Sequence, residues 1–163
     1  MTARLLLLLV FLGLSMAAAI ILSRKPEEML TGAATAMDGD SIRLNGQELR
    51  LNGLDAPEAR QTCADHTGRD YPCGRQSTLA LARLLARGAA TCIGAERDRY
   101  GRLLVTCRVN GVDIGAELVK NGHAVAYGRY AAEERFASED RRGIWSGRFE
   151  MPENYRHRLR NGA

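Results

Sequence analysis

The chain contains almost no lysine and little histidine. Only Lys25 and Lys120 are lysines among its 163 residues, so nearly all of its 23 basic residues are arginines. Such a bias reflects genomic base composition more readily than function, and an arginine outside a motif therefore proves little. The three histidines are scattered, and none has a nucleophile or metal partner close to it in the sequence. This pattern argues against a histidine-based mechanism.

Most of the chain also lacks an excess of positive or negative charge. The formal net charge is +4, but Arg4, Arg24 and Lys25 lie in a first segment that contains no acid. The remainder is nearly neutral. Overall basicity therefore does not indicate nucleic-acid binding, and any attraction for phosphate groups must be local.

Residues 5–22 form one uncharged, apolar run between Arg4 and the pair Arg24-Lys25. This pattern predicts that residues 1–25 are a signal peptide or an N-terminal transmembrane anchor. The three alanines at 17–19 fit a cleavage site, whereas residues 20–22 extend the apolar run enough to span a bilayer. Both alternatives stay open. Either one predicts an extracytoplasmic protein, which is secreted, periplasmic or anchored to the membrane.

Four cysteines follow this segment, at Cys63, Cys73, Cys92 and Cys107. An even number of cysteines behind an export segment predicts two disulfides. Cys92 and Cys107 lie in strand-like runs expected to be antiparallel neighbours, and Cys63 and Cys73 flank a polar loop. We therefore predict the pairs Cys63–Cys73 and Cys92–Cys107. The alternative is a zinc site that includes His66, but no Cys-x-x-Cys pair is present to support it.

Residues 37–58 are expected to form a β-hairpin. The segments 41–44 and 48–51 alternate apolar and polar residues, and Asn45-Gly46 between them is a strong two-residue turn signal. Strands that enter and leave a hairpin end on the same side of the sheet. Four carboxylates can therefore meet at one edge: Asp38, Asp40, Asp55 and Glu58.

Clustered carboxylates repel one another unless a positive charge lies among them. Calcium takes oxygen ligands of this kind, and Arg50 in the same hairpin is suited to bidentate phosphate binding. Together these groups indicate phosphodiester hydrolysis. The Asp-Gly-Asp tripeptide alone is more often a solvated turn, so further motifs are needed to decide between the two interpretations.

A second motif, Asp-Arg-Tyr-Gly-Arg, occupies residues 98–102 and leads into the strand-like run 103–107. With the segment Leu-Arg-Leu-Asn-Gly-Leu-Asp-Ala-Pro-Glu at 49–58, it resembles the thermonuclease family of staphylococcal-nuclease-like domains. The resemblance runs from about Thr31 to Trp145. It implies an oligonucleotide/oligosaccharide-binding (OB) barrel whose loops and one face bind single strands.

The resemblance also implies a role for each motif residue. Asp40 and Asp55 match calcium ligands, and the Ala56 carbonyl is expected to add a third. Glu58 resembles the general base or water-orienting group, and Arg50 and Arg102 resemble the pair that binds the phosphate. Two further residues are expected to contact substrate: Tyr100 and Tyr127.

The remaining pattern predicts helices at 75–87, 113–120 and 131–142, the second of them N-capped by Asp113. It predicts strands at 31–37, 41–44, 48–53, 89–95 and 103–108. The expected fold class is therefore α+β, a five-stranded OB-fold β-barrel with about three helices over residues 30–148. Residues 149–163 have no clear period and are expected to be a solvated C-terminal tail, with a weak phosphate contact by its basic residues as the alternative.

The function predicted from these features is that of a monomeric, calcium-dependent nuclease acting on DNA, RNA or both. The alternative is a catalytically silent oligonucleotide-binding module of the cell envelope. The intact motif residues argue against that alternative, because silent members of the family usually lose some of them.

Overall fold

The computed structural model describes residues 11–12 and 25–162. Most of the predicted leader therefore lies outside the described residues, and both alternatives for it stay predictions. Within the part of the chain that is described, no helix is long and apolar enough to cross a membrane.

The predicted hairpin is present. Strands β3 (Ser41–Leu44) and β4 (Gln47–Leu51) pair antiparallel. Asn45 and Gly46 between them have φ values of 51° and 79°. Two consecutive positive φ angles are typical of the tight turn whose twist matches a β-hairpin, and Asn-Gly adopts them at low cost.

This hairpin belongs to a curled, mixed sheet with the strand order β1-β8-β9-β4-β3-β2 and a short strand β10 (Val112–Asp113) paired to β9. The further strands are β1 (Glu28–Gly32), β2 (Ala34–Ala36), β8 (Ala90–Arg97) and β9 (Leu103–Val109). The pairing of β4 with β9 is parallel, with Leu49 opposite Leu103. This sheet has seven strands rather than five, because the expected strand at 31–37 changes partner from β8 to β3 and β10 was not predicted.

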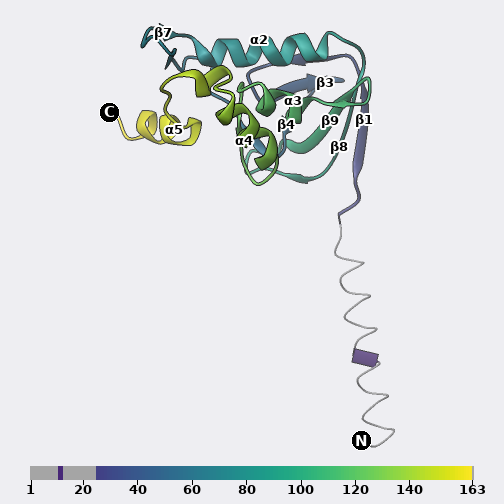
Figure 1. Cartoon of the computed structure of the whole chain (residues 1–163). Coiled ribbons are helices and arrows are strands. Elements are labelled where there is room, and N and C mark those ends of the chain that lie inside the picture. The colour runs from purple at the N-terminus through teal and green to yellow at the C-terminus, as the bar shows by residue number, and fades with distance from the viewer. Residues whose placement is uncertain (1–10, 13–24, 163) are drawn as a thin grey trace, which may run out of the picture.

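The three predicted helices are present with shifted ends. They are α2 (Cys73–Leu85), α3 (Ile114–Lys120) and α4 (Ala131–Glu139). Asp113 caps α3 by accepting hydrogen bonds from the backbone nitrogens of Gly115 and Ala116, as its position predicted. Helix α2 lies along the sheet (Figure 1) and buries Leu81, Leu84 and Leu85 in the main core.

A smaller apolar cluster lies beside the main core. It includes Cys63, Cys73 and Ile144, the last from the short helix η1 (Gly143–Ser146). Trp145 and Phe149 pack against this cluster. Two small sheets complete the fold: β5 (Leu54–Asp55) pairs with β11 (Val125–Ala126), and β6 (Cys63–Ala64) pairs with β7 (Asp70–Tyr71). Both predicted disulfides are present, Cys63–Cys73 and Cys92–Cys107.

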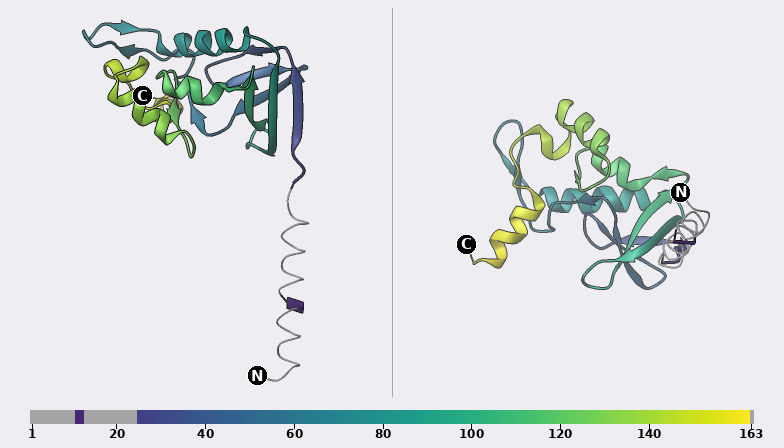
Figure 2. Two further views of the ribbon diagram at one scale, coloured as in Figure 1. Left: turned by 45° about the vertical axis from the view of Figure 1, so that its right-hand side comes forward. Right: turned by 90° about the horizontal axis from the view of Figure 1, so that it is seen from below.

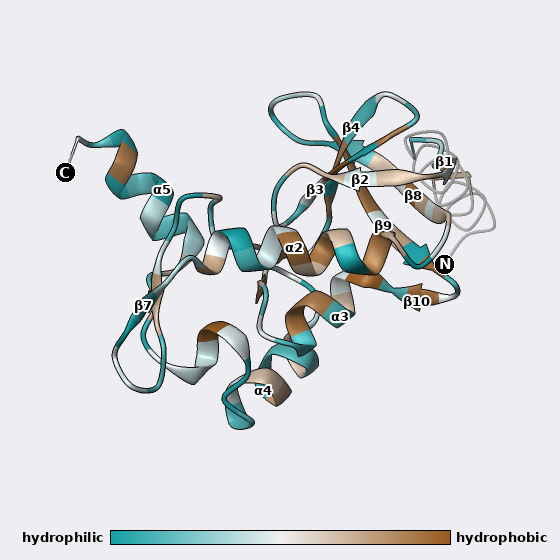
Figure 3. Ribbon diagram, turned by 90° about the horizontal axis from the view of Figure 1, so that it is seen from above, coloured by the Kyte–Doolittle hydropathy of each residue, from teal (hydrophilic) through white to brown (hydrophobic). Residues whose placement is uncertain are grey.

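The predicted C-terminal tail is largely exposed to solvent, but it is helical, which was not expected. Helix α5 (Pro152–Arg160) occupies this segment. It lies at the end of the molecule opposite β1 (Figures 1 and 2) and is largely hydrophilic (Figure 3). Pro152 is its only buried residue. The helix has only three apolar residues, Pro152, Tyr155 and Leu159, among charged ones, so its period is only weakly marked in the sequence.

Candidate active site

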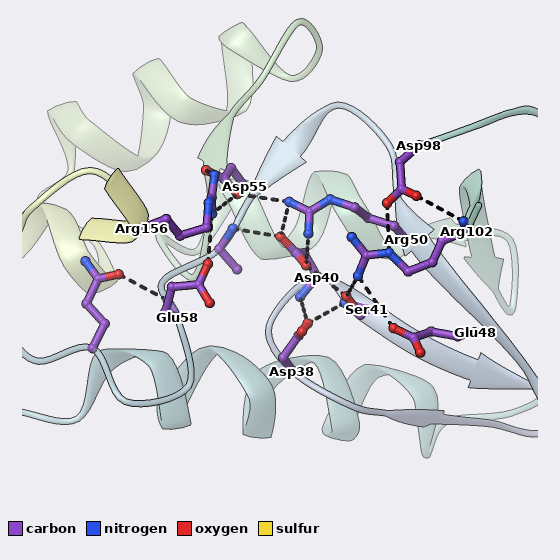
Figure 4. Close-up of polar contacts among 12 residues, drawn as sticks. Asp38, Asp40, Ser41, Glu48, Arg50, Asp55, Glu58, Asp98, Arg102 and Arg156 are labelled. Atoms are coloured by element: carbon purple, nitrogen blue, oxygen red, sulfur yellow. Dashed lines mark hydrogen bonds and ion pairs between the residues drawn. The ribbon is translucent and has the colours of Figure 1, made fainter. Parts of the chain in front are cut away.

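The hairpin and the strand that follows it bring three predicted acids together. Asp40 directly precedes β3, Asp55 ends β5, and Glu58 follows in the next loop (Figure 4). Asp40 and Asp55 are each only 4% exposed. We call Asp40, Asp55 and Glu58 the acidic cluster.

Arg50 joins two members of this cluster. Its Nη1 donates to Asp40 Oδ1 at 2.9 Å, and its Nη2 lies 2.8 Å from Asp40 Oδ2 and 3.0 Å from Asp55 Oδ1. The sheet fixes this geometry, because Arg50 on β4 pairs with Ser41, the residue after Asp40. The guanidinium therefore offsets the repulsion between the two buried carboxylates.

Burial raises the pKa of Asp40 to about 7, although the Arg50 guanidinium acts to lower it. The backbone N–H of Ala56 also donates to Asp40, over 3.2 Å, and holds the Asp40 carboxylate against the loop after β5. The structure thus brings the backbone of Ala56 beside Asp40. The proposed role of its carbonyl stays a prediction.

Asp38 does not join the acidic cluster through its side chain. Its Oδ1 accepts hydrogen bonds from the backbone nitrogens of Asp40 and Ser41, at 3.0 and 2.7 Å. Asp38 therefore shapes the turn that presents Asp40.

Arg102 is held by the turn at residues 98–102. Its Nε donates to Asp98 Oδ2 at 2.8 Å, and its Nη1 reaches Ser41 Oγ at 3.2 Å and Glu48 Oε1 at 3.5 Å. Burial opposes ionisation of Asp98, but its hydrogen bonds with Arg102 outweigh that effect and lower its pKa. The turn thus keeps an ionised acid beside Arg102 and directs the guanidinium toward the hairpin (Figure 4).

A further residue near the acidic cluster, Gln61, was not expected from the sequence. Its side chain is fully buried, and its Oε1 accepts from the backbone N–H of Glu58 at 3.1 Å. Its Nε2 donates to the backbone carbonyl of Glu150 at 2.6 Å. Gln61 therefore fixes the Glu58 loop to the segment that leads into α5, and a lone glutamine in a polar stretch gives no signal of this.

Arg156 on α5 was also missed. Its Nη1 lies 2.9 Å from both Asp55 Oδ1 and Glu58 Oε1, and its Nη2 lies 2.9 Å from Asp55 Oδ2. These hydrogen bonds, those to Asp55 first, raise the pKa of Arg156 despite its partial burial. Proline at the first position and basic residues in the last turn could have indicated a helix, but nothing in the sequence pointed to these partners.

These groups surround one cavity of about 520 Å³. Tyr100 and Tyr127 stand at its edge, 69% and 67% exposed. Glu153 and Arg156 of α5 also line the cavity. The other lining residues include every one to which a catalytic, metal or substrate role was predicted: Asp40, Arg50, Asp55, Ala56, Glu58, Tyr100, Arg102 and Tyr127.

The donors around this cavity are carboxylate and backbone oxygens, which suit a hard cation such as calcium better than a transition metal. Within the described residues, no three histidine, cysteine, aspartate or glutamate side chains are arranged to hold a metal ion. Instead, Arg50 and Arg156 take both oxygens of Asp55. The donor chemistry therefore fits calcium, and a metal would have to compete with guanidinium groups for these carboxylate oxygens.

Comparison with known proteins gives relatives of several kinds. The chain is 40% identical over 125 residues to a succinoglycan biosynthesis protein, ExoI, of Rhizobium meliloti, covering 72% of this chain and 65% of that protein. It is 31% identical over 116 residues to a probable staphylococcal-like nuclease of Oryza sativa subsp. japonica, covering 67% of this chain and 28% of the relative. It is 31% identical over 134 residues to an uncharacterized endonuclease of Escherichia coli, covering 75% and 81%.

The chain thus spans less than two-thirds of the length of the Rhizobium and rice relatives. Residues 48–147, more than half of the chain, match the family described as staphylococcal nuclease homologue. This stretch contains Arg50, Asp55, Glu58 and Arg102. The chain belongs to the staphylococcal nuclease homologue family.

Proposed function

We propose that this protein is a calcium-dependent nuclease that hydrolyses phosphodiester bonds of DNA, RNA or both. The observation that carries the proposal is the convergence of Arg50, Arg102 and the acidic cluster on one cavity. Carboxylates that hold a cation, a carboxylate that handles water and two guanidiniums are the groups that phosphodiester hydrolysis requires.

Each residue has a distinct part in the proposed mechanism. Asp40, Asp55 and the Ala56 carbonyl would hold calcium, which would supply positive charge to the phosphate. Glu58 orients the attacking water and accepts its proton, and its 38% exposed side chain leaves room for that water. Arg50 and Arg102 bind the phosphate oxygens and stabilise the negative charge that develops as water attacks in line.

The tyrosines at the cavity edge suggest how the substrate is held. Tyr100 and Tyr127 are exposed aromatic rings next to charged groups. Bases of a single strand can stack on such rings while the backbone lies toward the arginines. We therefore propose that the curled sheet is an OB-type barrel that presents a single-stranded segment to the acidic cluster.

Cellular location and domain limits belong to the same proposal. The two disulfides support an oxidising compartment, in agreement with the predicted leader. We propose an extracytoplasmic monomer, secreted, periplasmic or membrane-anchored, with a nuclease-like domain over residues 30–148. Helix α5 in the following segment then contributes Arg156 to the cavity of that domain.

Two rival functions deserve a direct test. A silent binding module would hold oligonucleotides without cleaving them, although none of its proposed catalytic side chains is missing. A role in polysaccharide biosynthesis is suggested by the name of the Rhizobium relative alone. That role would require a substrate other than nucleic acid.

Digestion assays separate these possibilities. Single-stranded DNA, duplex DNA and RNA are incubated with the purified protein in calcium and, in parallel, in chelator. We expect cleavage in calcium that stops in chelator. A simple aryl phosphodiester, which has no bases, is tested as a further substrate. Binding of oligonucleotides without cleavage would favour the silent module. Failure to bind or cleave any of them would remove nucleic acid as the substrate.

A further inference from the structure

The contact between Arg156 and the acidic cluster engages the groups that the proposed chemistry needs. Both oxygens of Asp55 and one oxygen of Glu58 accept hydrogen bonds from this single guanidinium. Under the proposed function, Asp55 is a metal ligand and Glu58 handles water. Arg156 therefore forms hydrogen bonds with the proposed metal ligand and with the proposed base at the same time.

Apart from this contact and the hydrogen bond of Gln61 to Glu150 just before its first turn, helix α5 is weakly anchored. Pro152 is its only buried residue, and the Arg156 side chain is 33% exposed. Arg50, in contrast, extends from a strand in the interior of the main sheet. Of the two guanidiniums on Asp55, the one on α5 can leave with less disturbance to the fold, because less buried surface moves with it.

A divalent cation and a guanidinium cannot share the same carboxylate oxygens without strong repulsion, since both are positive and need the same lone pairs. We propose that Arg156 is an internal competitor of the metal ion. Its guanidinium neutralises the acidic cluster in the metal-free protein and leaves Asp55 when calcium binds, which loosens α5. This inference rests on the proposed function, because it takes Asp55 as a calcium ligand.

Calcium binding without nucleotide tests the proposal directly. Isothermal titration calorimetry compares the wild type with Arg156→Gln, which removes the charge, and Arg156→Lys, which keeps a charge but not the planar fork. Arg158→Gln is the matched control, because Arg158 lies on the same helix and pairs with Glu150 instead. We expect the calcium affinity of Arg156→Gln to be at least about tenfold higher than that of the wild type. A change of this size corresponds to the loss of one charge-assisted hydrogen-bonding competitor. Arg156→Lys should fall between, and Arg158→Gln should match the wild type.

A measurement on the wild type keeps the proposal testable if Arg156→Gln does not fold. Amide hydrogen exchange of residues 152–160 should become faster on addition of calcium, because α5 loses its contact with Asp55. In that case, unchanged or slower exchange overturns the proposal.

The outcomes separate this inference from the proposed function. Calcium affinity that is equal or weaker in Arg156→Gln overturns the competition, and calcium-dependent cleavage by the same sample leaves the nuclease proposal standing. If no variant binds calcium, the calcium assignment and the inference both fall. If only Arg156→Gln binds calcium, the competition is supported in its strongest form.

Discussion

The amide nitrogen of Gln61 lies 2.6 Å from the backbone carbonyl oxygen of Glu150. The same buried side chain accepts the backbone N–H of Glu58, so one residue positions the proposed base and the start of α5. These two partners, Glu58 and Glu150, lie far apart in the sequence. Gln61 therefore connects the cavity to the C-terminal segment.

Replacement of Gln61 by methionine, which has similar length but no amide, should destabilise the protein by about 1–3 kcal/mol. The reason is that two backbone groups lose their partner in a buried place. Urea denaturation measures the change, and turnover should fall because the Glu58 loop is less fixed. Gln76→Met on the exposed face of α2 is the control, for which a change within about 0.5 kcal/mol is expected.

Arg102→Lys should lower turnover by orders of magnitude while the melting temperature changes little. Lysine keeps the charge but cannot maintain contact with Asp98 and also present two donors to a phosphate. Steady-state kinetics and thermal denaturation measure the two effects. Arg108→Lys, at an exposed position outside the cavity, is the control. A near-normal rate for Arg102→Lys would show that Arg102 is only a turn charge.

Glu58→Gln and Asp40→Asn should fail in different ways. Asp40→Asn should require more calcium, and added calcium should recover part of its activity. Glu58→Gln should still bind calcium and nucleotide, while its chemical rate falls by about 10²–10⁴-fold for a lost general base. Calcium titrations of activity and binding of a non-hydrolysable nucleotide measure both. Rescue of Glu58→Gln by calcium contradicts the assigned roles.

The stability of the metal-free protein relative to Asp40→Asn should fall as pH rises from 4 to 7. The pKa of Asp40 is raised to about 7, above its unfolded value of 3.8. The native state therefore holds more protons in this window, and the stabilisation from the bound proton is fully present below pH 3.8 and lost as pH rises through 7. Asparagine does not titrate. Denaturation of both proteins in chelator should show a relative loss on the order of 2 kcal/mol or more. A constant difference would contradict the shift.

Thiol labelling of the unreduced, denatured protein should find no free cysteine. Removal of the Cys92–Cys107 bridge, which closes a separation of 15 residues, should cost about 3 kcal/mol. The Cys92→Ala/Cys107→Ala protein and the wild type are compared by chemical denaturation. Four labelled thiols in the protein from its natural host would contradict the export proposal.

The sequence predicted those parts of the structure that local chemistry determines. The Asn45-Gly46 turn, the Asp113 cap and the alternation along β3 and β4 each depend on a few neighbouring residues. These signals predict that the acids meet at one edge of the sheet, whereas they leave open which face Arg50 points to. The pair Cys92–Cys107 followed from two further strands expected to be antiparallel neighbours, and the pair Cys63–Cys73 from the polar loop that these two cysteines flank.

Tertiary contacts determine the rest, and local sequence patterns carry little signal for them. Helix α5 buries only Pro152, and its few apolar residues stand among charged ones, so its helical period is only weakly marked in the sequence. The role of Arg156 comes from partners about a hundred positions earlier in the chain, and a bias toward arginine hides any single functional one. Gln61 was not expected because its two partners are backbone groups, which no side-chain pattern in the sequence reveals.

The register of β4 limits where the chain can change length during evolution. Arg50 faces the cavity because β4 is aligned with β3 on one side and with β9 on the other. One residue inserted between Gln47 and Arg50 would turn Arg50 toward the core and its apolar neighbours toward the cavity. The exposed loop at residues 66–69 contributes no residue to the cavity. Insertions and deletions in functional relatives should therefore gather in that loop and spare β4.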